Sequence, residues 1–303
     1  MLNIKYSDNS KIFNIHTGGI PFISFDMLDR LGVPNLFTTR YISFDQETGK
    51  GVSGLRLAVM NDEDIDEASP VCRRNRDILA HQLGSSISME GITDQKHTNN
   101  VYAISGEDLG VATVGNFALH RRYVDGVVTD IPGAVLTVFG GDCPPVYIAD
   151  PVRGAIGLVH AGWRGTLGKI PEVAIANMVV RYGCRPSDMY AAIGPGICKD
   201  CYEMGDEVYD AFAEAWGGDD ADRILSRYPA VDAGGNEIPG GKYHLDLREA
   251  NRLTLLRAGI PEDRIAVSNI CTKCNADTFY SYRAHRMENE QTAMMVNRFG
   301  GEA

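Results

Sequence analysis

The sequence lacks any hydrophobic run approaching the roughly 18 consecutive apolar residues that a membrane-spanning helix needs. Its N-terminus also lacks the basic start and continuous apolar core of a secretory signal peptide. Only 7 of its 303 residues are cysteine, an odd number that is too small and too irregularly spaced for a disulfide scaffold. These absences favour a protein of the reducing cytoplasm that has no membrane partner.

Basic residues are also scarce, because 29 Lys and Arg face 40 Asp and Glu and leave a formal net charge of −11. Binding to nucleic acid backbones requires clustered Lys and Arg, so a nucleic acid partner is not expected. Aromatic residues make up only 8%, but the 44% of hydrophobic and 23% of charged residues are typical of a soluble globular protein.

Short segments of two kinds alternate along the chain. Apolar runs bounded by turn residues predict strands at residues 101–105, 126–129, 134–139, 146–149, 155–159, 189–193, 264–270 and 291–296. Capping residues and terminal glycines predict helices at residues 69–84, 171–182, 206–216 and 246–258. Pro70 is expected in the first turn of its helix, and the Gly-, Asp- and Pro-rich residues 217–241 are interpreted as a surface insertion. The pattern indicates the α+β class, with helices and strands mixed in one layered domain.

Two glycine-rich segments carry the side chains best suited to catalysis or metal binding. Cys143 lies in Gly140–Asp150 and His160 in Gly154–Gly165, each next to an apolar run. Such turns bring polar atoms to the rim of a sheet without burying them unpaired. A thiolate and an imidazole could supply two of the three protein ligands of a catalytic zinc site. They could also act as a nucleophile with its base, or be a buried thiol and a hydrogen-bonded histidine without catalytic function.

A third ligand would come from another thiol or another histidine, and spacing does not select among the histidines His16, His81, His97, His120, His244 and His285. His97 lies in a polar turn before an expected strand, which is a better setting for a ligand than that of His81 in an expected helix. From local context alone, His97 is equally interpreted as a surface histidine.

Two Cys-x-x-Cys pairs, Cys198–Cys201 and Cys271–Cys274, offer four further thiols. Four thiols in such pairs form either a structural zinc site or a redox centre. The 69 residues between the two pairs far exceed the roughly 15 to 20 of a zinc ribbon. We therefore interpret the four as incidental thiols, with structural zinc as the alternative.

Three arginines lie in aromatic or glycine-rich settings, and a guanidinium can hold a phosphate through two parallel hydrogen bonds. Arg40 follows Phe37–Thr39, Arg164 lies in a Gly-Trp-Arg-Gly turn, and Arg283 ends Tyr280–Arg283. Each is individually typical of a surface or ion-paired arginine. Together they are a candidate anion pocket in an acidic protein.

The order of several motifs along almost the whole chain carries a resemblance. The motifs are Phe37–Arg40, Asn75–Arg76, Gln95–His97, Asp125–Thr129, Gly141–Pro144, His160–Gly165, Ile193–Ile197, Cys201–Glu203, Cys271–Thr272 and Tyr280–Arg283. Together they resemble the laccase-domain family, also known as the polyphenol oxidase or YfiH/YlmD-type purine nucleoside phosphorylase family. The resemblance implies a single domain over residues 1–303, of the Cys/His hydrolase-like YfiH type and compatible with a monomer.

The resemblance also implies a zinc site made by His97, Cys143 and His160. Family members are described as cleaving adenosine, inosine or guanosine with phosphate into free base and ribose 1-phosphate. Deamination of adenosine and phosphorolysis of methylthioadenosine are implied as further activities. The expected partners are therefore purine nucleosides and phosphate.

The implied chemistry gives roles to further residues. Phosphorolysis requires an anion site, which Arg40, Arg164 and Arg283 would supply. Deamination requires water activated by zinc and a carboxylate that moves protons, for which Asp142 and Asp125 are the candidates. We expect Asp142 to complete the catalytic site of the three zinc ligands.

Three alternative functions stay open. A copper-dependent polyphenol oxidase needs many clustered histidines, and the 7 in this chain include no His-x-His pair, so zinc is expected rather than copper. A Cys143 thiolate with His160 as its base would give an amidase that edits peptidoglycan precursors. A purely structural metal would leave a non-enzymatic nucleotide-binding module.

Overall fold

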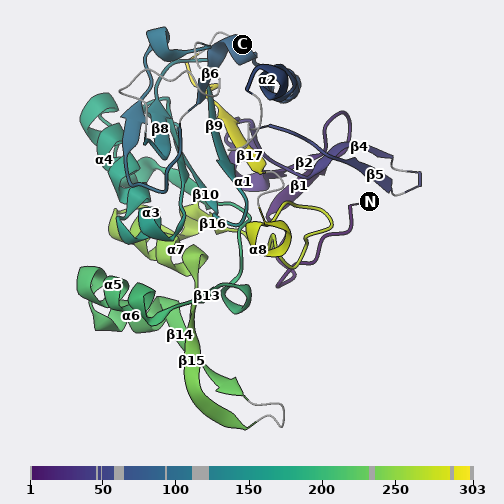
Figure 1. Ribbon diagram of the computed structural model, residues 1–303. Coiled ribbons are helices and arrows are strands. Elements are labelled where there is room, and N and C mark those ends of the chain that lie inside the picture. The colour runs from purple at the N-terminus through teal and green to yellow at the C-terminus, as the bar shows by residue number, and fades with distance from the viewer. Residues whose placement is uncertain are drawn as a thin grey trace.

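The computed structural model describes residues 2–45, 47–48, 50–57, 65–92, 94–110, 123–231, 236–286 and 290–300. Two six-stranded sheets pack face to face, and helices cover the outer face of each sheet (Figure 1). This layered arrangement confirms the expected mixed α/β fold.

The first sheet contains strands from near both ends of the chain. Its strand order is β1 (Phe13–His16), β2 (Phe22–Phe25), β3 (Asn35–Thr38), β17 (Gln291–Val296), β9 (Val135–Gly140) and β6 (Glu90–Ile92). The C-terminal strand β17 pairs antiparallel with β3 on one side and β9 on the other. Helix α2 (Ile65–Gln82) packs on the outer face through Leu79 and Ala80.

The second sheet carries most of the candidate site. Its strand order is β16 (Ile265–Val267), β12 (Tyr190–Ile193), β10 (Pro145–Asp150), β11 (Ala155–His160), β8 (Gly126–Thr129) and β7 (Val101–Ala103). Helices α4 (Ile170–Tyr182) and α7 (Leu247–Arg257) cover its outer face. Asp246 caps α7 by accepting the backbone N–H groups of Arg248 and Glu249, as the sequence predicts.

Successive side chains of a strand point to opposite faces of the sheet, so a strand buried on both faces has apolar side chains at consecutive positions. On β10, Tyr147 and Ala149 join the core between the sheets, whereas Val146 and Ile148 face α4. A strand buried on both sides has no polar face, so it becomes a continuous apolar run in the sequence. This is why these short strands are predictable from composition alone.

The other elements surround this core. The α-helices and strands are α1 (Asp26–Arg30), β4 (Tyr41–Asp45), β5 (Lys50–Ser53), α3 (Trp163–Leu167), β13 (Glu203–Met204), α5 (Asp206–Trp216), α6 (Gly218–Ile224), β14 (Leu225–Val231), β15 (Glu237–Leu245) and α8 (Tyr282–His285). Short 3-10 helices are η1 (Ile87–Met89), η2 (Gly106–Asp108), η4 (Pro186–Asp188), η5 (Lys199–Cys201) and η6 (Glu262–Arg264).

Residues 217–241 contain regular structure, and two local predictions need correction. Residues 217–241 contain helix α6 and most of the β14–β15 hairpin, which extends away from the two sheets (Figure 1). Ala221 and Ile224 are buried against the neighbouring helices and order this segment despite its Gly and Asp content. Pro70 lies inside α2 rather than in its first turn, because the helix already includes Ile65. The strand expected over 264–270 ends at Val267, since its pairing with the short strand β12 ends there.

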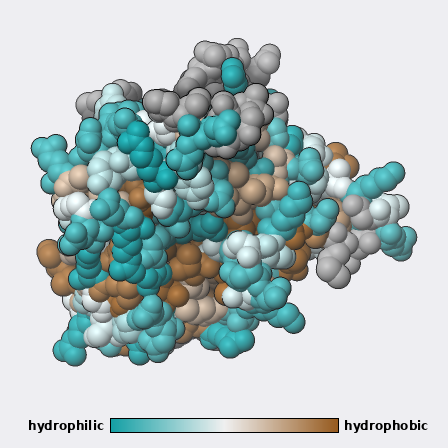
Figure 2. Space-filling model, turned by 90° about the horizontal axis from the view of Figure 1, so that it is seen from below, coloured by the Kyte–Doolittle hydropathy of each residue, from teal (hydrophilic) through white to brown (hydrophobic). Residues whose placement is uncertain are grey.

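The described surface is mainly polar on the face seen from below, with hydrophobic side chains gathered across its middle (Figure 2). Within the described ranges, no helix has both the length and the apolar character to cross a membrane.

Candidate metal centre and active site

The fold brings His97, Cys143 and His160 together at one edge of the second sheet. Cys143 lies in the turn between β9 and β10, His160 is the last residue of β11, and His97 precedes β7. Their ligand atoms lie within 4.8 Å of one another, and Cys143 Sγ is 3.9 Å from His97 Nε2. His160 is buried, whereas His97 is exposed to solvent. The cluster is therefore an accessible group of two imidazoles and one thiol.

Asp125, directly before β8, organises both histidines. Its Oδ1 lies 2.9 Å from His160 Nδ1 and accepts the backbone N–H of His97 at 2.9 Å. Its Oδ2 accepts the backbone N–H of Thr98 at 2.7 Å and that of Lys96 at 3.1 Å. His97 adopts a left-handed backbone with a φ of 59°, and this set of hydrogen bonds holds it there.

Gly162 leaves the space between the three side chains open. A Cβ at this position would lie 3.0 Å from Cys143 Sγ, 2.9 Å from His97 Cδ2 and 3.6 Å from His160 Cε1. Its φ of −66° is one that any residue can adopt, so backbone strain is not the reason for glycine here. The requirement is the free volume between the candidate ligands.

The ionisable groups of the cluster favour a charged state. Burial opposes ionisation of the Cys143 thiol, but the charge of His160 and hydrogen bonds from both histidines outweigh it and lower the thiol pKa to about 7. Burial also opposes protonation of His160, but Cys143 and Asp125 raise its pKa to about 10. Both shifts favour a thiolate beside an imidazolium, and such a thiolate binds metals or attacks electrophiles.

Asp142, expected to be catalytic, has its carboxylate occupied by two hydrogen bonds. It accepts the Thr272 hydroxyl at 2.6 Å and the backbone N–H of Arg283 at 2.8 Å. Its own backbone is left-handed, with a φ of 102°. These bonds fix the turn that presents Cys143, so the geometry favours a positioning role for Asp142.

The three candidate anion-binding arginines have different direct contacts. Arg283 lies over the Tyr202 ring at 5.4 Å, and its guanidinium donates to the Glu203 carbonyl. Burial raises the pKa of Tyr202. The charges of Cys143 and Asp142 raise this pKa further, whereas those of Arg283 and Arg164 lower it. Arg164 and Arg283 therefore share surroundings with Cys143.

Arg40 has different neighbours. Its guanidinium donates to the Ala276 carbonyl at 2.9 Å, lies 3.1 Å from His285 Nε2 and stacks over Tyr280. These contacts attach β3 and the following residues to the segment before α8. They favour a structural role for Arg40.

The sequence prediction missed Glu290, which precedes β17. Burial raises the pKa of Glu290, while the charges of His160, His97 and Lys96 lower it. The carboxyl group therefore lies within electrostatic range of both histidines of the cluster. No motif marks this residue, and only the position of β17 beside β9 brings it near the site.

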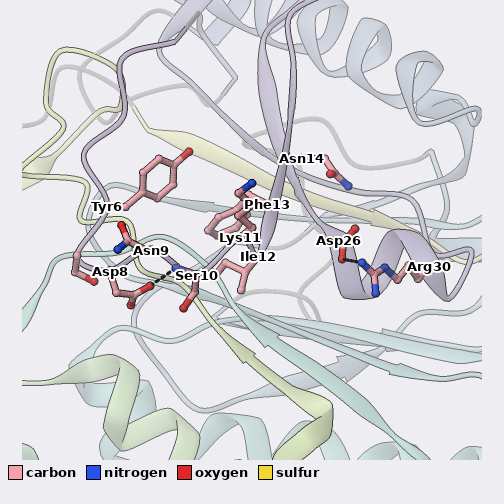
Figure 3. Close-up of a pocket in the computed structure, with 11 residues that line it drawn as sticks. Tyr6, Asp8, Asn9, Ser10, Lys11, Ile12, Phe13, Asn14, Asp26 and Arg30 are labelled. Atoms are coloured by element: carbon pink, nitrogen blue, oxygen red, sulfur yellow. Dashed lines mark hydrogen bonds and ion pairs between the residues drawn. The ribbon is translucent and has the colours of Figure 1, made fainter.

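The other histidines have separate surroundings. His16 stacks on Phe22, His81 bonds within α2, and His244 lies against the Lys199 carbonyl. His120, also considered as a ligand, lies outside the described residues. A cavity of about 870 Å³ beside β1 and α1 is lined by residues such as Lys11 and contains none of the cluster residues (Figure 3).

The four cysteines of the Cys-x-x-Cys pairs form a second cluster. Their sulfurs all lie within 4.8 Å of one another, which contradicts the interpretation of them as unrelated incidental thiols. The parallel strands β12 and β16 lead into the two segments, and Gly196 forms a bridge with Cys271 just beyond them. Spacing along the chain failed as a guide because neighbouring parallel strands can be far apart in sequence.

Comparison with known proteins supports one family. Residues 42–297 match the family model described as multi-copper polyphenol oxidoreductase laccase. The chain is 37% identical over 254 residues to a purine nucleoside phosphorylase of Deinococcus radiodurans, covering 84% of each protein. It is 36% identical over 220 residues to adenosine deaminase RL5 of an unknown prokaryotic organism, covering 73% of this chain and 79% of that protein.

A solved structure agrees with these matches. The crystal structure of YlmD from Geobacillus stearothermophilus superposes with a TM-score of 0.75 at 30% identity, covering 95% of this chain and 100% of that one. The family match, the relatives and the shared fold extend over the same strands and turns that bring His97, Cys143 and His160 together. The chain belongs to the laccase-like family of multi-copper polyphenol oxidoreductases, which its YlmD-type relatives share.

Proposed function

We propose that the protein is a zinc-dependent purine nucleoside phosphorylase. Its substrates would be adenosine, inosine or guanosine with phosphate, and its products the free base and ribose 1-phosphate. Adenosine deamination and methylthioadenosine phosphorolysis are proposed as further activities. The observation that carries the proposal is the convergence of His97, Cys143 and His160 into one accessible cluster, in a chain whose relatives are named purine nucleoside phosphorylase and adenosine deaminase.

The residues of the cluster fit zinc. Two imidazole nitrogens and one thiolate are donors that zinc accepts, and three protein ligands leave a position for another group. Asp125 orients His160 from behind, as carboxylates do for metal-bound histidines. Gly162 keeps the volume between the donors free. When bound there, zinc would act as a Lewis acid on an oxygen or nitrogen of the substrate.

The other polar groups fit phosphorolysis. Phosphate attacks the anomeric carbon of the ribose while the bond to the purine breaks, so the site must hold an anion and protonate the departing base. Arg164 and Arg283 would attract the phosphate beside Tyr202. Burial makes the carboxyl of Glu290 retain its proton to higher pH, which suits it to donate that proton to the purine. Asp142 would act by positioning Cys143 and Arg283.

A copper oxidase is less well supported. Multicopper oxidation needs a blue-copper centre and a further copper cluster, both rich in histidine. Across the described ranges, the two groups of metal-binding side chains contain only the histidines His97 and His160. The amidase alternative is supported by one feature, the lowered pKa of the Cys143 thiol beside His160, whose own pKa is raised.

A direct assay separates these proposals. The purified, zinc-loaded protein is incubated with inosine or adenosine, with and without phosphate, and free base and ribose 1-phosphate are quantified. We expect phosphate-dependent release of base, and loss of this release in His97→Ala. If base release is absent while the metal-free protein hydrolyses an amide through Cys143, the amidase alternative replaces the phosphorylase.

The phosphate site has its own test. Arg164→Gln and Arg283→Gln should each raise the KM for phosphate by roughly tenfold or more, because a charge-assisted hydrogen bond contributes about 1.5–3 kcal/mol. Arg181→Gln, an exposed charge on α4, is the matched control. An unchanged KM in both site variants would contradict the assignment.

The domain organisation belongs to the same proposal. We propose that residues 1–303 form one catalytic domain, with 217–241 as an insertion on it. In support, the cluster that buries Ala221 and Ile224 also includes Leu247 and Ala250 of α7, which packs on the second sheet. A shared apolar contact of this kind is typical of an addition to a domain rather than of a separate one.

A further inference from the structure

The second cysteine cluster is held in place by backbone on both sides. Cys198 directly precedes the short 3-10 helix η5 and Cys201 is its last residue, and the backbone N–H of Cys201 donates to the Cys198 carbonyl at 3.0 Å. The segment of Cys271 is joined to this one where the Thr272 N–H donates to the Gly196 carbonyl at 3.2 Å. The four thiols are thus brought together by the fold and not by flexible side chains alone.

The sulfur positions fit a tetrahedral metal ion. With zinc–sulfur bonds of about 2.3 Å, the sulfurs of a tetrahedral site lie about 3.8 Å apart. Cys201 Sγ and Cys274 Sγ are 3.6 Å apart, and no pair in the cluster exceeds 4.8 Å. A disulfide needs sulfurs about 2.05 Å apart, so the cluster is wider than a disulfide and close to the metal geometry.

Backbone N–H groups also point at one sulfur. Cys271 Sγ lies 3.2 Å from the Cys198 N–H and 3.4 Å from the Cys274 N–H. Donors directed at a sulfur stabilise the thiolate form that metals bind and fix its orientation. Cys271 is buried and Cys274 is exposed, so the cluster has a path for an ion to enter.

We propose that Cys198, Cys201, Cys271 and Cys274 bind a second zinc ion in a closed, purely structural site. Four thiolates complete a tetrahedral shell and leave no position for substrate. The site is separate from the His97 cluster and does not depend on the proposed activity. Its ion would cross-link two segments that are about 70 residues apart in sequence, which is the kind of loop closure that stabilises a fold most.

This site would also support the active-site turn. Thr272, next to Cys271, donates its hydroxyl to Asp142, and the Ile197 N–H, next to Cys198, donates to the Asp142 carbonyl at 2.8 Å. A Cβ at Gly196 would lie only 2.8 Å from that carbonyl, so the contact is close. Both cysteine segments therefore hold the residue that precedes Cys143.

The test is zinc content, measured by mass spectrometry of metals on protein purified without metal-affinity tags. We expect two zinc ions per chain in the unmodified protein. Cys201→Ser/Cys274→Ser should keep one ion, in the His97 cluster, and His97→Ala/His160→Ala should keep the other. Cys184→Ala removes a buried thiol outside both clusters and should keep two.

Two further measurements keep the proposal testable if the Cys201→Ser/Cys274→Ser variant does not fold. With cobalt(II) in place of zinc, a strong thiolate charge-transfer absorption should persist in His97→Ala/His160→Ala. Peptide mapping should show all four cysteines protected from alkylation until a chelator is added. The proposal would be overturned by a single zinc ion per chain in the unmodified protein that the Cys201→Ser/Cys274→Ser variant also holds, or by a disulfide among the four cysteines in freshly purified protein.

Discussion

The Asp125 carboxylate binds both histidines of the candidate metal centre, His160 through its ring and His97 through its backbone. The two contacts are each 2.9 Å long, and Asp125 is fully buried. A single carboxylate thus sets the ring orientation of one ligand and the turn of the other. The geometry of the candidate metal centre depends on this residue, although it is not itself expected to bind the ion.

Asp125→Asn should weaken zinc binding by about 10- to 100-fold, because the partner that orients His160 loses its charge. The dissociation constant is measured by competition with a chelator of known affinity. Asp150→Asn, another buried aspartate that accepts backbone N–H groups in a turn, is the matched control. Equal zinc affinity in both variants would show that Asp125 has no part in binding.

Gly162→Ala should prevent metal binding at the His97 cluster without unfolding the protein, since the added methyl would occupy the space between His97 and Cys143. Zinc content and phosphorolysis are both expected to fall to the level of His97→Ala. Gly18→Ala is the control, because a Cβ there meets no atom within 4 Å. Normal zinc content in Gly162→Ala would mean that the ion lies elsewhere.

Cys143 in the metal-free protein should react with iodoacetamide in its thiolate form. The lowered pKa of this thiol means that the thiolate is present above about pH 7 and is lost as the pH falls through that value. The pH at which the labelling rate of Cys143 is half-maximal should rise in His160→Gln toward the ordinary thiol pKa of about 8.5. Labelling is followed on the Cys143 peptide by mass spectrometry, and added zinc should suppress it. The same half-maximal pH in the unmodified protein and in His160→Gln would argue against a charged pair of Cys143 and His160.

Arg76→Met should destabilise the fold by about 3–5 kcal/mol, because it leaves the Glu90 carboxylate buried and unpaired. Arg76 and Glu90 are each 2% exposed, and their contact is 3.0 Å long. Arg30→Met, which breaks an exposed pair with Asp26, should cost no more than about 1 kcal/mol. Urea unfolding measures the free energy of unfolding of both variants. The double variant Arg76→Met/Glu90→Gln should recover part of the stability that Arg76→Met loses. A similarly small loss of unfolding free energy in Arg76→Met and Arg30→Met would contradict the argument that burial makes the Arg76–Glu90 pair costly to break.

Several strands were predictable because burial leaves a direct trace in composition. β10 and β11 are apolar on both faces, so they become uninterrupted runs that end at turn residues. Asp246 and Gly183 also marked helix ends correctly, since a capping side chain and a left-handed glycine act within a few residues. These features depend only on residues that are close in sequence, so the sequence alone is enough to predict them.

The resemblance to a known family selected His97, but spacing could not, because the turn of His97 reaches Cys143 only through the register of β7, β8 and β11. The role of Asp125 and the position of Glu290 likewise depend on which strands are neighbours. The four cysteines are the clearest case, since two Cys-x-x-Cys pairs far apart in sequence meet only where β12 and β16 pair in parallel.

The sequence by itself determined the short buried strands, the capped helices and the two glycine-rich turns, because each depends on interactions within a few residues. Tertiary structure alone decided that Arg283 lies over Tyr202 while Arg40 contacts Ala276 and His285. It also decided that Asp142 faces Thr272 and the Arg283 backbone. The physical reason is that these contacts join residues from separate strands and turns, whose meeting is set by sheet order and core packing.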